Sequence, residues 1–263
     1  MIIVPLLLLN NTTLIMLMKF FILTISIFCF GVQSLAQFNF DKQVKTDIKY
    51  SENIIDEVYG ITIYEPLNLG LSPDSVRMEN GYAINNWKED FYESGQLLHK
   101  GYYIEGQLKV YKNYYPDGTL ERDFKNIDGF RSKCSLYYPS GKIKSEIVYL
   151  NGAAISWIDY YDNGNMEYLE KYDKNFLYHI AKKSFYKTGQ IETFFELTNK
   201  KKLQFVTYEY FLNGEKKMEG ALRYDMNRYD YYKTGTWIYY NESGLEKKHE
   251  TYSDGKVVKT KQF

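Results

Sequence analysis

From about residue 81 to the C-terminus, aromatic and polar residues alternate in short runs that end at glycines. A typical run is "YYPDGTLERDF" (114–124), and a near copy, "YYPSGKIKSEI", follows at 137–147. Successive glycines of this kind are 23, 23, 23, 25, 25 and 30 residues apart. Repetition at a nearly fixed period is typical of repeat architectures. The glycines that define the period are Gly95, Gly118, Gly141, Gly164, Gly189, Gly214 and Gly244.

An aromatic residue stands three positions before most of these glycines. In the last copy, "YYNESG", Tyr240 stands four positions before Gly244, which predicts one extra residue in that turn. In the other copies the aromatic residues are Tyr92, Tyr115, Tyr138, Tyr161, Tyr186 and Phe211.

A second turn is predicted eleven residues after each glycine, where Gly, Asn and Asp dominate because they tolerate turn conformations. An apolar residue follows two positions after each of the first five glycines, from Leu97 to Ile191. The residues at the second turn are Gly106, Gly129, Gly152, Asn175, Lys200, Asp225 and Gly255.

Each copy therefore predicts a turn, a strand, a second turn and a second strand. Strands of roughly six residues joined by short Gly-containing turns are the signature of β-hairpins. A glycine about every twelve residues would interrupt any helix. The longest interval contains "YDMNRYDYYKTG" (224–235), which predicts either an extended loop or a longer hairpin.

This pattern resembles the variant MORN repeat, the form found in the YwqK-type antitoxin family and in many exported bacterial proteins. The matching stretches are "YKNYYPDGTL", "YLNG" with "WIDYYDNGNM", and "WIYYNESGL" with "YSDG", and the resemblance extends from about Gly81 to Phe263. It implies an all-β fold, an elongated antiparallel meander of about seven two-stranded repeats in a single-layer twisted sheet. The antitoxin name also implies a toxin partner.

The first 80 residues lack the repeat and predict two further segments. "MKFFILTISIFCFGVQSLAQ", which begins at Met18, has a basic start, an apolar run and a small-residue cleavage site, as a secretory signal peptide does. We expect residues 1–36 to be this signal, and Met16 and Met18 are alternative translation starts; an uncleaved membrane anchor is the alternative to a cleaved signal. Residues 37–80 are expected to cap the repeat domain, 81–263. The predicted location is outside the cytoplasm: the periplasm, the outer-membrane surface or the medium.

Charge and composition limit the classes of binding partner that are expected. Basic and acidic residues number 33 each, so there is no net charge to attract nucleic acid or an anionic membrane. The chain has 28 Tyr and 16 Phe, which favour strands and can lie half in water. No integral membrane span is expected after signal cleavage.

Residues that could carry chemistry have simpler structural interpretations. Asp159, Asn163, Gly164 and Glu170 fit part of a calcium-loop pattern, but Tyr161 occupies a position that needs an oxygen ligand. Cys134 stands where Tyr111, Trp157 and Trp237 stand in other copies, and Trp87 lies nearby in the first, so a buried packing role is expected. The histidines His99, His179 and His249 fall in different repeats without metal-ligand spacing.

No catalytic motif, cofactor motif or metal site is predicted, so we expect a non-enzymatic scaffold. It is predicted to bind a protein, a peptide or a cell-envelope glycan through a Tyr-rich sheet face. The alternative is an antitoxin or immunity protein that neutralises a toxin by occluding it. The aromatic residues predicted for the binding face are Tyr92, Tyr115, Tyr138, Tyr161 and Tyr186.

Overall fold

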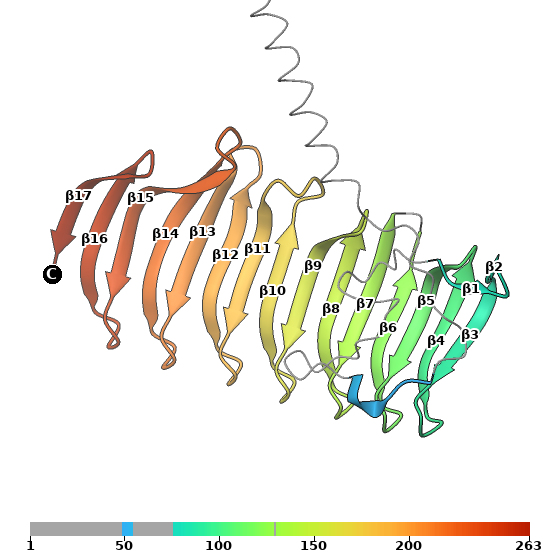
Figure 1. The fold of residues 1–263 in the computed structure, drawn as a ribbon. Coiled ribbons are helices and arrows are strands. Elements are labelled where there is room, and N and C mark those ends of the chain that lie inside the picture. Colours follow the sequence, from blue (N-terminus) through green and yellow to red (C-terminus); the bar gives the residue numbers. More distant parts are fainter. Residues whose placement is uncertain (1–48, 55–75, 129) are drawn as a thin grey trace, which may run out of the picture.

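The computed structural model describes residues 49–54, 76–128 and 130–263. Fifteen antiparallel strands, β3 to β17, form one open sheet in which every strand pairs with its neighbours in sequence. Figure 1 shows this meander as a single twisted layer, with β3 and β17 at opposite edges. The predicted all-β meander is confirmed, and the described residues contain no α-helix.

The short elements before the sheet are η1 (Glu52–Ile54), β1 (Met78–Glu79) and β2 (Tyr82–Ala83), of which β1 and β2 pair with each other. The strands of the sheet are β3 (Asn86–Phe91), β4 (Leu97–Ile104), β5 (Gln107–Tyr114), β6 (Leu120–Asn126), β7 (Arg131–Tyr137), β8 (Ile143–Leu150), β9 (Ala153–Tyr160), β10 (Met166–Tyr172), β11 (His179–Phe185), β12 (Ile191–Asn199), β13 (Gln204–Tyr210), β14 (Lys216–Asp225), β15 (Asp230–Tyr240), β16 (Glu246–Ser253) and β17 (Lys256–Gln262).

The turns at the period-defining glycines share one geometry. In the second copy, Gly118 donates its N–H to the carbonyl of Tyr115 at 2.8 Å, and Tyr115 donates to the carbonyl of Thr119 at 2.8 Å. Gly118 has φ +85°, which only glycine adopts without steric cost. Equivalent bonds and a positive φ recur at all seven of these glycines: Gly95, Gly118, Gly141, Gly164, Gly189, Gly214 and Gly244.

The last copy does not have the extra turn residue that the sequence predicted. Gly244 donates to the carbonyl of Asn241, and Asn241 donates to the carbonyl of Leu245. Asn241 therefore occupies the aromatic position of the turn, and Tyr240 ends the preceding strand. The prediction was wrong because the last copy was aligned with the others by its double tyrosine. Its turn hydrogen bonds are made one residue later, by Asn241.

The second turns fall into two kinds. Those at Gly106, Gly152 and Gly255 are two-residue hairpins in which the preceding residue also has a positive φ. In the hairpins predicted at Asn175, Lys200 and Asp225, the positive φ falls on a later residue, and the loops are longer. Gly129 lies outside the described residues. The residues with positive φ in the longer hairpins are Phe176, Leu203 and Tyr229.

The 30-residue interval forms a longer hairpin, one of the two predicted possibilities. It extends β14 and β15 on either side of residues 226–229. An irregularity in the β14–β15 pairing lies at Gly220, opposite the stretch from Gly235 to Trp237. A Cβ on Gly220 would lie 2.2 Å from the Trp237 ring, so the tryptophan lies directly over this glycine.

A β-bulge follows every period-defining turn. After Gly164, for example, Met166 pairs with Tyr160 and Tyr168 pairs with Asp159, which leaves Glu167 as the additional residue. A bulge increases local twist and redirects side chains. Counted from its turn glycine, the bulged residue is always the third: Leu98, Glu121, Lys144, Glu167, Glu192, Lys217 and Lys247.

One face of the sheet carries the hydrophobic core, and we call it the core face. Cross-strand partners succeed one another on it in the order Tyr111, Phe124, Cys134, Ile147 and Trp157. These residues belong to a first cluster, which extends from Ile84 to Trp157. A second cluster lies toward the C-terminal half and is built from Tyr178, Phe205, Tyr224 and their neighbours.

Residues before the sheet attach to its first strands. Tyr50 forms a parallel bridge to Tyr92, and Arg77 pairs with Asp90 at 2.5 Å while donating its backbone N–H to the carbonyl of Gly106. Both Arg77 and Asp90 are buried. The cap expected over 37–80 stays a prediction, because its residues 37–48 and 55–75 lie outside the described residues. The predicted signal peptide, 1–36, also lies outside them.

Within the described part of the chain, no helix is both long and apolar enough to cross a membrane.

Candidate functional site

The five tyrosines predicted for the binding face form a hydrogen-bonded series that we call the tyrosine ladder. Each hydroxyl donates to a backbone carbonyl at the end of a strand in the following repeat, at 2.6 to 2.9 Å. The ladder ties each turn to the next one. The donor and acceptor pairs are Tyr92 to Tyr114, Tyr115 to Tyr137, Tyr138 to Tyr160, Tyr161 to Phe185, and Tyr186 to Tyr210.

Burial differs along the ladder. Tyr92 and Tyr115 are buried, whereas Tyr138, Tyr161 and Tyr186 are half-buried. Burial raises the pKa of the Tyr138 and Tyr161 hydroxyls, which keeps them protonated as donors. Binding by the ladder tyrosines stays a prediction, and the half-buried members are the ones with ring surface to offer a partner.

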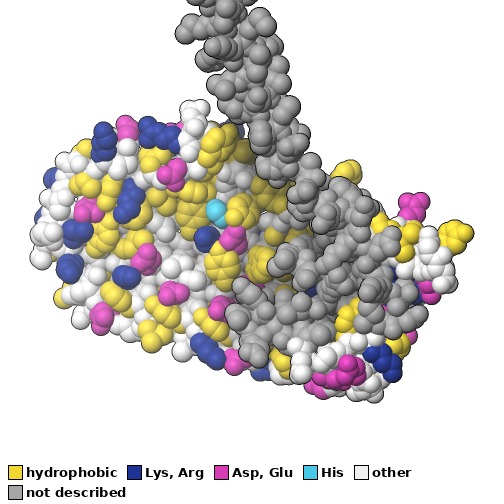
Figure 2. All heavy atoms as spheres, viewed as in Figure 1, with side chains coloured by type: hydrophobic (Ala, Val, Ile, Leu, Met, Phe, Trp, Pro, Cys, Tyr) yellow, Lys and Arg dark blue, Asp and Glu magenta, His cyan; other side chains and the backbone are white. Residues whose placement is uncertain are grey.

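The core face is hollowed between its two clusters by what we call the central groove, which consists of two adjoining cavities. Figure 2 shows hydrophobic side chains gathered around acidic ones in the middle of the face in view. The first cavity measures about 620 Å³ and spans β7 to β12. Its lining residues are Leu136, Tyr138, Lys144, Ser145, Trp157, Asp159, Tyr160, Tyr161, Glu167, Tyr168, Ser184, Phe185 and Glu192.

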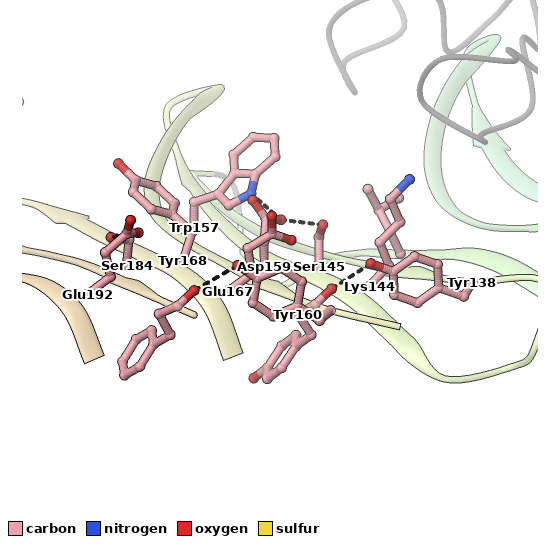
Figure 3. A pocket seen from close by; sticks show the side chains of 13 residues that line it. Tyr138, Lys144, Ser145, Trp157, Asp159, Tyr160, Glu167, Tyr168, Ser184 and Glu192 are labelled. Atoms are coloured by element: carbon pink, nitrogen blue, oxygen red, sulfur yellow. Dashed lines mark hydrogen bonds between the residues drawn. The ribbon is translucent and has the colours of Figure 1, made fainter. Parts of the chain in front are cut away.

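Carboxylates lie among the aromatic rings of the first cavity. The Asp159 carboxylate accepts hydrogen bonds from Ser145 Oγ at 2.5 Å and from Trp157 Nε1 at 2.6 Å (Figure 3). Both donors are neutral, so they orient Asp159 without cancelling its charge. Glu192 accepts from Ser184 Oγ at 2.9 Å, and Glu167 is exposed at its bulge.

One cation lines the same cavity, and the carboxylates outnumber it. Lys144 lies with Nζ 5.6 Å from the centre of the Tyr138 ring. Ammonium groups are attracted to aromatic faces at this range. The groove can therefore offer a partner both aromatic surface and negative charge.

The second cavity measures about 500 Å³ and shares Trp157, Asp159 and Tyr168 with the first. Glu170 lines it, accepts a hydrogen bond from the Tyr168 hydroxyl and lies 3.3 Å from His179 Nε2. Burial alone would raise the pKa of Glu170, but hydrogen bonds from Tyr168 and Tyr172 hold that pKa below its usual value. Its other lining residues are Ala154, Ser156, Tyr172 and Phe176.

Cys134 lies where the sequence predicted, at a packing position of the core face. It is fully buried, between its cross-strand partners Phe124 and Ile147. Burial raises the pKa of its thiol to about 12, so the nucleophilic thiolate is disfavoured. Trp87 does not share this position, because it pairs with Tyr102 on the opposite face and is 53% exposed.

The structure keeps the three histidines apart. His99 is buried, with Nδ1 2.7 Å from Asn113 Oδ1 and Nε2 3.1 Å from the Tyr103 hydroxyl. His179 lies beside Glu170, and His249 lies beside Phe263. Among the described residues, no group of three or more His, Cys, Asp or Glu side chains is arranged to hold a metal ion.

The residues of the calcium-like pattern lie on a hairpin. Asp159 belongs to β9 and Glu170 to β10, and Gly164 lies in the tight turn between the two strands. Both carboxylates accept hydrogen bonds from side chains of the central groove.

In a comparison with protein-family models, residues 133–151 match the MORN repeat variant. This stretch comprises most of β7, the turn at Gly141, and β8. The match supports a MORN-repeat protein. The MORN turn found there recurs with the same hydrogen bonds in the six other copies. The match concerns the repeat and not the YwqK-type antitoxin family, so the antitoxin role stays a prediction. No curated protein matches the chain.

Sequence reasoning missed the central groove. Asp159 and Glu170 were noted only as part of a calcium pattern, and Tyr168 and Ser184 were not singled out. A signal was available, since residues at matching offsets from successive turn glycines lie side by side on one sheet face. A comparison of offsets across the strands would have placed Trp157, Asp159 and Tyr168 together.

Proposed function

We propose that the protein is a non-enzymatic, exported repeat scaffold that binds a partner in its central groove. The observation that carries the proposal is the hollow between the two clusters. On either side of the hollow the core face is filled by the chain's own aromatic and aliphatic side chains. In the middle, rings and carboxylates instead line open cavities.

The lining suits binding rather than catalysis. Aromatic side chains provide large contact area at low entropic cost and are enriched where proteins bind partners. The Asp159 carboxylate is held in place by Ser145 and Trp157, so it is pre-oriented toward a ligand. MORN-repeat proteins are generally scaffolds, which is consistent with this proposal. The predicted signal peptide is the basis for including export.

Affinity capture with two matched variants tests the proposal. Glu167→Arg reverses a charge at an exposed position in the groove, and Glu242→Arg makes the same change at the exposed turn of the last copy. We expect the wild-type protein and Glu242→Arg to retain the same partner from the envelope fraction, and Glu167→Arg to lose it. Equal retention by all three proteins would remove the groove as the binding site.

The identity of the captured partner also separates the predicted roles. A toxin whose lethality is relieved by co-expression would favour the antitoxin alternative. A partner that is not toxic would favour a structural scaffold.

A further inference from the structure

Two of the seven copies share an aromatic and acidic arrangement on the core face. In the last copy, Trp237 of β15 is the cross-strand partner of Glu250, and Tyr252 follows two residues later. In the fourth copy, Trp157 is the cross-strand partner of Glu170, and Tyr172 follows two residues later. In both copies the tryptophan lies seven residues before the turn glycine, and the glutamate lies six after it.

In the last copy a lysine of the same chain fills this arrangement. Lys233 Nζ lies 4.0 Å from the centre of the Trp237 ring, 5.0 Å from that of Tyr252 and 5.8 Å from that of Tyr239. The same ammonium donates hydrogen bonds to the hydroxyls of Tyr239 at 3.1 Å and of Tyr252 at 3.4 Å. Three rings around one ammonium group form an aromatic cage for a cation.

Glu250 adjoins the filled cage through Tyr252. It accepts a hydrogen bond from the Tyr252 hydroxyl at 2.8 Å and pairs with Lys248 at 2.7 Å. Hydrogen bonds from Lys248 and Tyr252 lower the pKa of Glu250 to about 2, so its negative charge is retained at neutral pH.

In the fourth copy the lysine is missing and a cavity takes its place. Lys233 stands eleven residues before its turn glycine, and Ala153 stands eleven before Gly164. The neighbouring Ala154 lines the second cavity of the central groove, together with Trp157, Glu170 and Tyr172. A methyl group cannot reach the rings, so about 500 Å³ stays open where the last copy holds an ammonium group.

The charge of this cavity also favours a cation. Asp159, which replaces the third ring of the filled cage, and Glu170 both line the cavity. Two basic side chains lie near the lining. His179 Nε2 is 3.3 Å from Glu170, and burial lowers the pKa of His179, which favours its neutral form. Lys182 Nζ lies 6.0 Å from the centre of the Tyr168 ring. Neither of them lines the cavity.

We propose that the second cavity of the central groove binds the ammonium group of a lysine side chain from an extended segment of a partner protein. This inference rests on the proposed function and adds the chemistry of the partner. The lysine would place its ammonium between the Trp157 and Tyr172 rings, with Asp159 and Glu170 supplying the opposite charge. Its methylene groups would lie against the aromatic lining of the groove.

The test is a calorimetric titration with an octapeptide of alternating lysine and serine. The same peptide with acetylated lysines is the neutral control, and a neutral oligosaccharide is the second probe. We expect the lysine peptide to bind and its acetylated form to bind at least about tenfold more weakly, since acetylation removes the cation.

Two variants assign any binding to the cavity. Ala154→Lys supplies an internal ammonium, as Lys233 does in the last copy, and should abolish peptide binding. Thr188→Lys adds the same charge at an exposed turn and should bind as the wild type does after correction for charge. If Ala154→Lys does not fold, Glu170→Gln replaces it and should weaken binding by at least about tenfold.

The outcomes separate the two proposals. Equal binding of the charged and acetylated peptides, or unchanged binding by Ala154→Lys, would overturn the lysine cage. Binding of the oligosaccharide alone would also overturn it, while leaving the central groove as a binding site. Failure of the groove itself is shown independently by the Glu167→Arg capture experiment.

Discussion

The hydroxyl of Tyr138 donates a hydrogen bond to the backbone carbonyl of Tyr160, 2.6 Å away, and so joins the turn of one repeat to the end of a strand in the next. Four other tyrosines make the same connection. In a sheet with one layer, contacts are mostly between neighbouring repeats. The hydrogen bonds of the ladder therefore stabilise the contact between neighbouring repeats directly.

Removal of one hydroxyl tests this contribution. Tyr138→Phe keeps the ring and loses the bond to Tyr160, so we expect the free energy of unfolding to fall by about 1 kcal/mol. Tyr82→Phe is the matched control, because Tyr82 is 80% exposed. Urea unfolding measures both changes, and equal stability of the two variants would contradict a structural role for the ladder.

The ladder can also be extended at its one aromatic position without a hydroxyl. Phe211 occupies the tyrosine position of the sixth copy. Two asparagines show how this turn is placed: Asn213 Nδ2 lies 2.7 Å from the Glu242 carbonyl, and in the fourth copy Asn163 Nδ2 lies at the same distance, 2.7 Å, from the Lys187 carbonyl. These two turns are therefore spaced alike. Phe211→Tyr should donate to the Tyr240 carbonyl and raise the free energy of unfolding by about 1 kcal/mol. A fall in melting temperature would show that the spacing differs.

Much of the fold could be predicted from the sequence because its turns are chemically explicit. A glycine that recurs at a nearly fixed interval identified all seven turns, including the one at Gly118. The positive φ of each turn explains why a glycine stands there. The position of Cys134 was predicted by the same comparison of offsets. The last turn was misread because Tyr239 and Tyr240 imitate the double tyrosine, although Asn241 makes the hydrogen bonds.

The candidate site was harder to predict because it depends on which strands lie side by side and where the core face is left open. Trp157 and Glu170 are thirteen residues apart in sequence but are direct cross-strand partners. The cage of the fourth copy is open because alanines stand at 153 and 154. An alanine in the sequence does not indicate a cavity unless the side chains around it are known.

At Gly164 the effect of backbone conformation can be measured without a steric contact. Gly164 has φ +96° and no atom within 4 Å of an added Cβ, so Gly164→Ala should cost about 1–2 kcal/mol from backbone strain alone. Gly164→Asn should cost less, because asparagine tolerates this region better. Thermal unfolding of the two variants provides the comparison, and an equal cost for both would point to a cause other than φ.

Stability should decrease as the pH falls below neutrality because of His99. Burial lowers the pKa of His99 to about 4, whereas an unfolded histidine titrates near 6.5. Between these two pH values the unfolded chain binds a proton at His99 that the folded chain does not bind. The contribution of neutral His99 to the free energy of unfolding is therefore complete above pH 6.5 and is lost as the pH falls toward 4. Between pH 7 and pH 5 the loss should be about 2 kcal/mol.

The comparison that isolates this effect is urea unfolding of the wild type and of His99→Gln at both pH values. The variant should show a smaller difference between pH 7 and pH 5. His179, whose pKa burial also lowers, remains in both proteins and cancels. Identical pH dependence in the two proteins would exclude His99 as the source.

The Cys134 thiol should be inert in the folded protein. It is fully buried and its pKa is raised to about 12, so little thiolate forms at pH 8 and a reagent cannot reach it. In protein that lacks residues 1–36, and therefore Cys29, a thiol-specific chromogenic reagent should react only after denaturant is added. Fast reaction without denaturant would place Cys134 outside the core.

The proposed binding site for the partner is the hollow between the two clusters. Position-specific photocrosslinking in the cells that make the protein tests it most directly, with the crosslinker at Glu167 in the groove and, for comparison, at Glu242 in the last turn. We expect one discrete crosslinked product from position 167 and none from position 242. Crosslinking from 242 alone, or none from 167 when capture shows a bound partner, would contradict it.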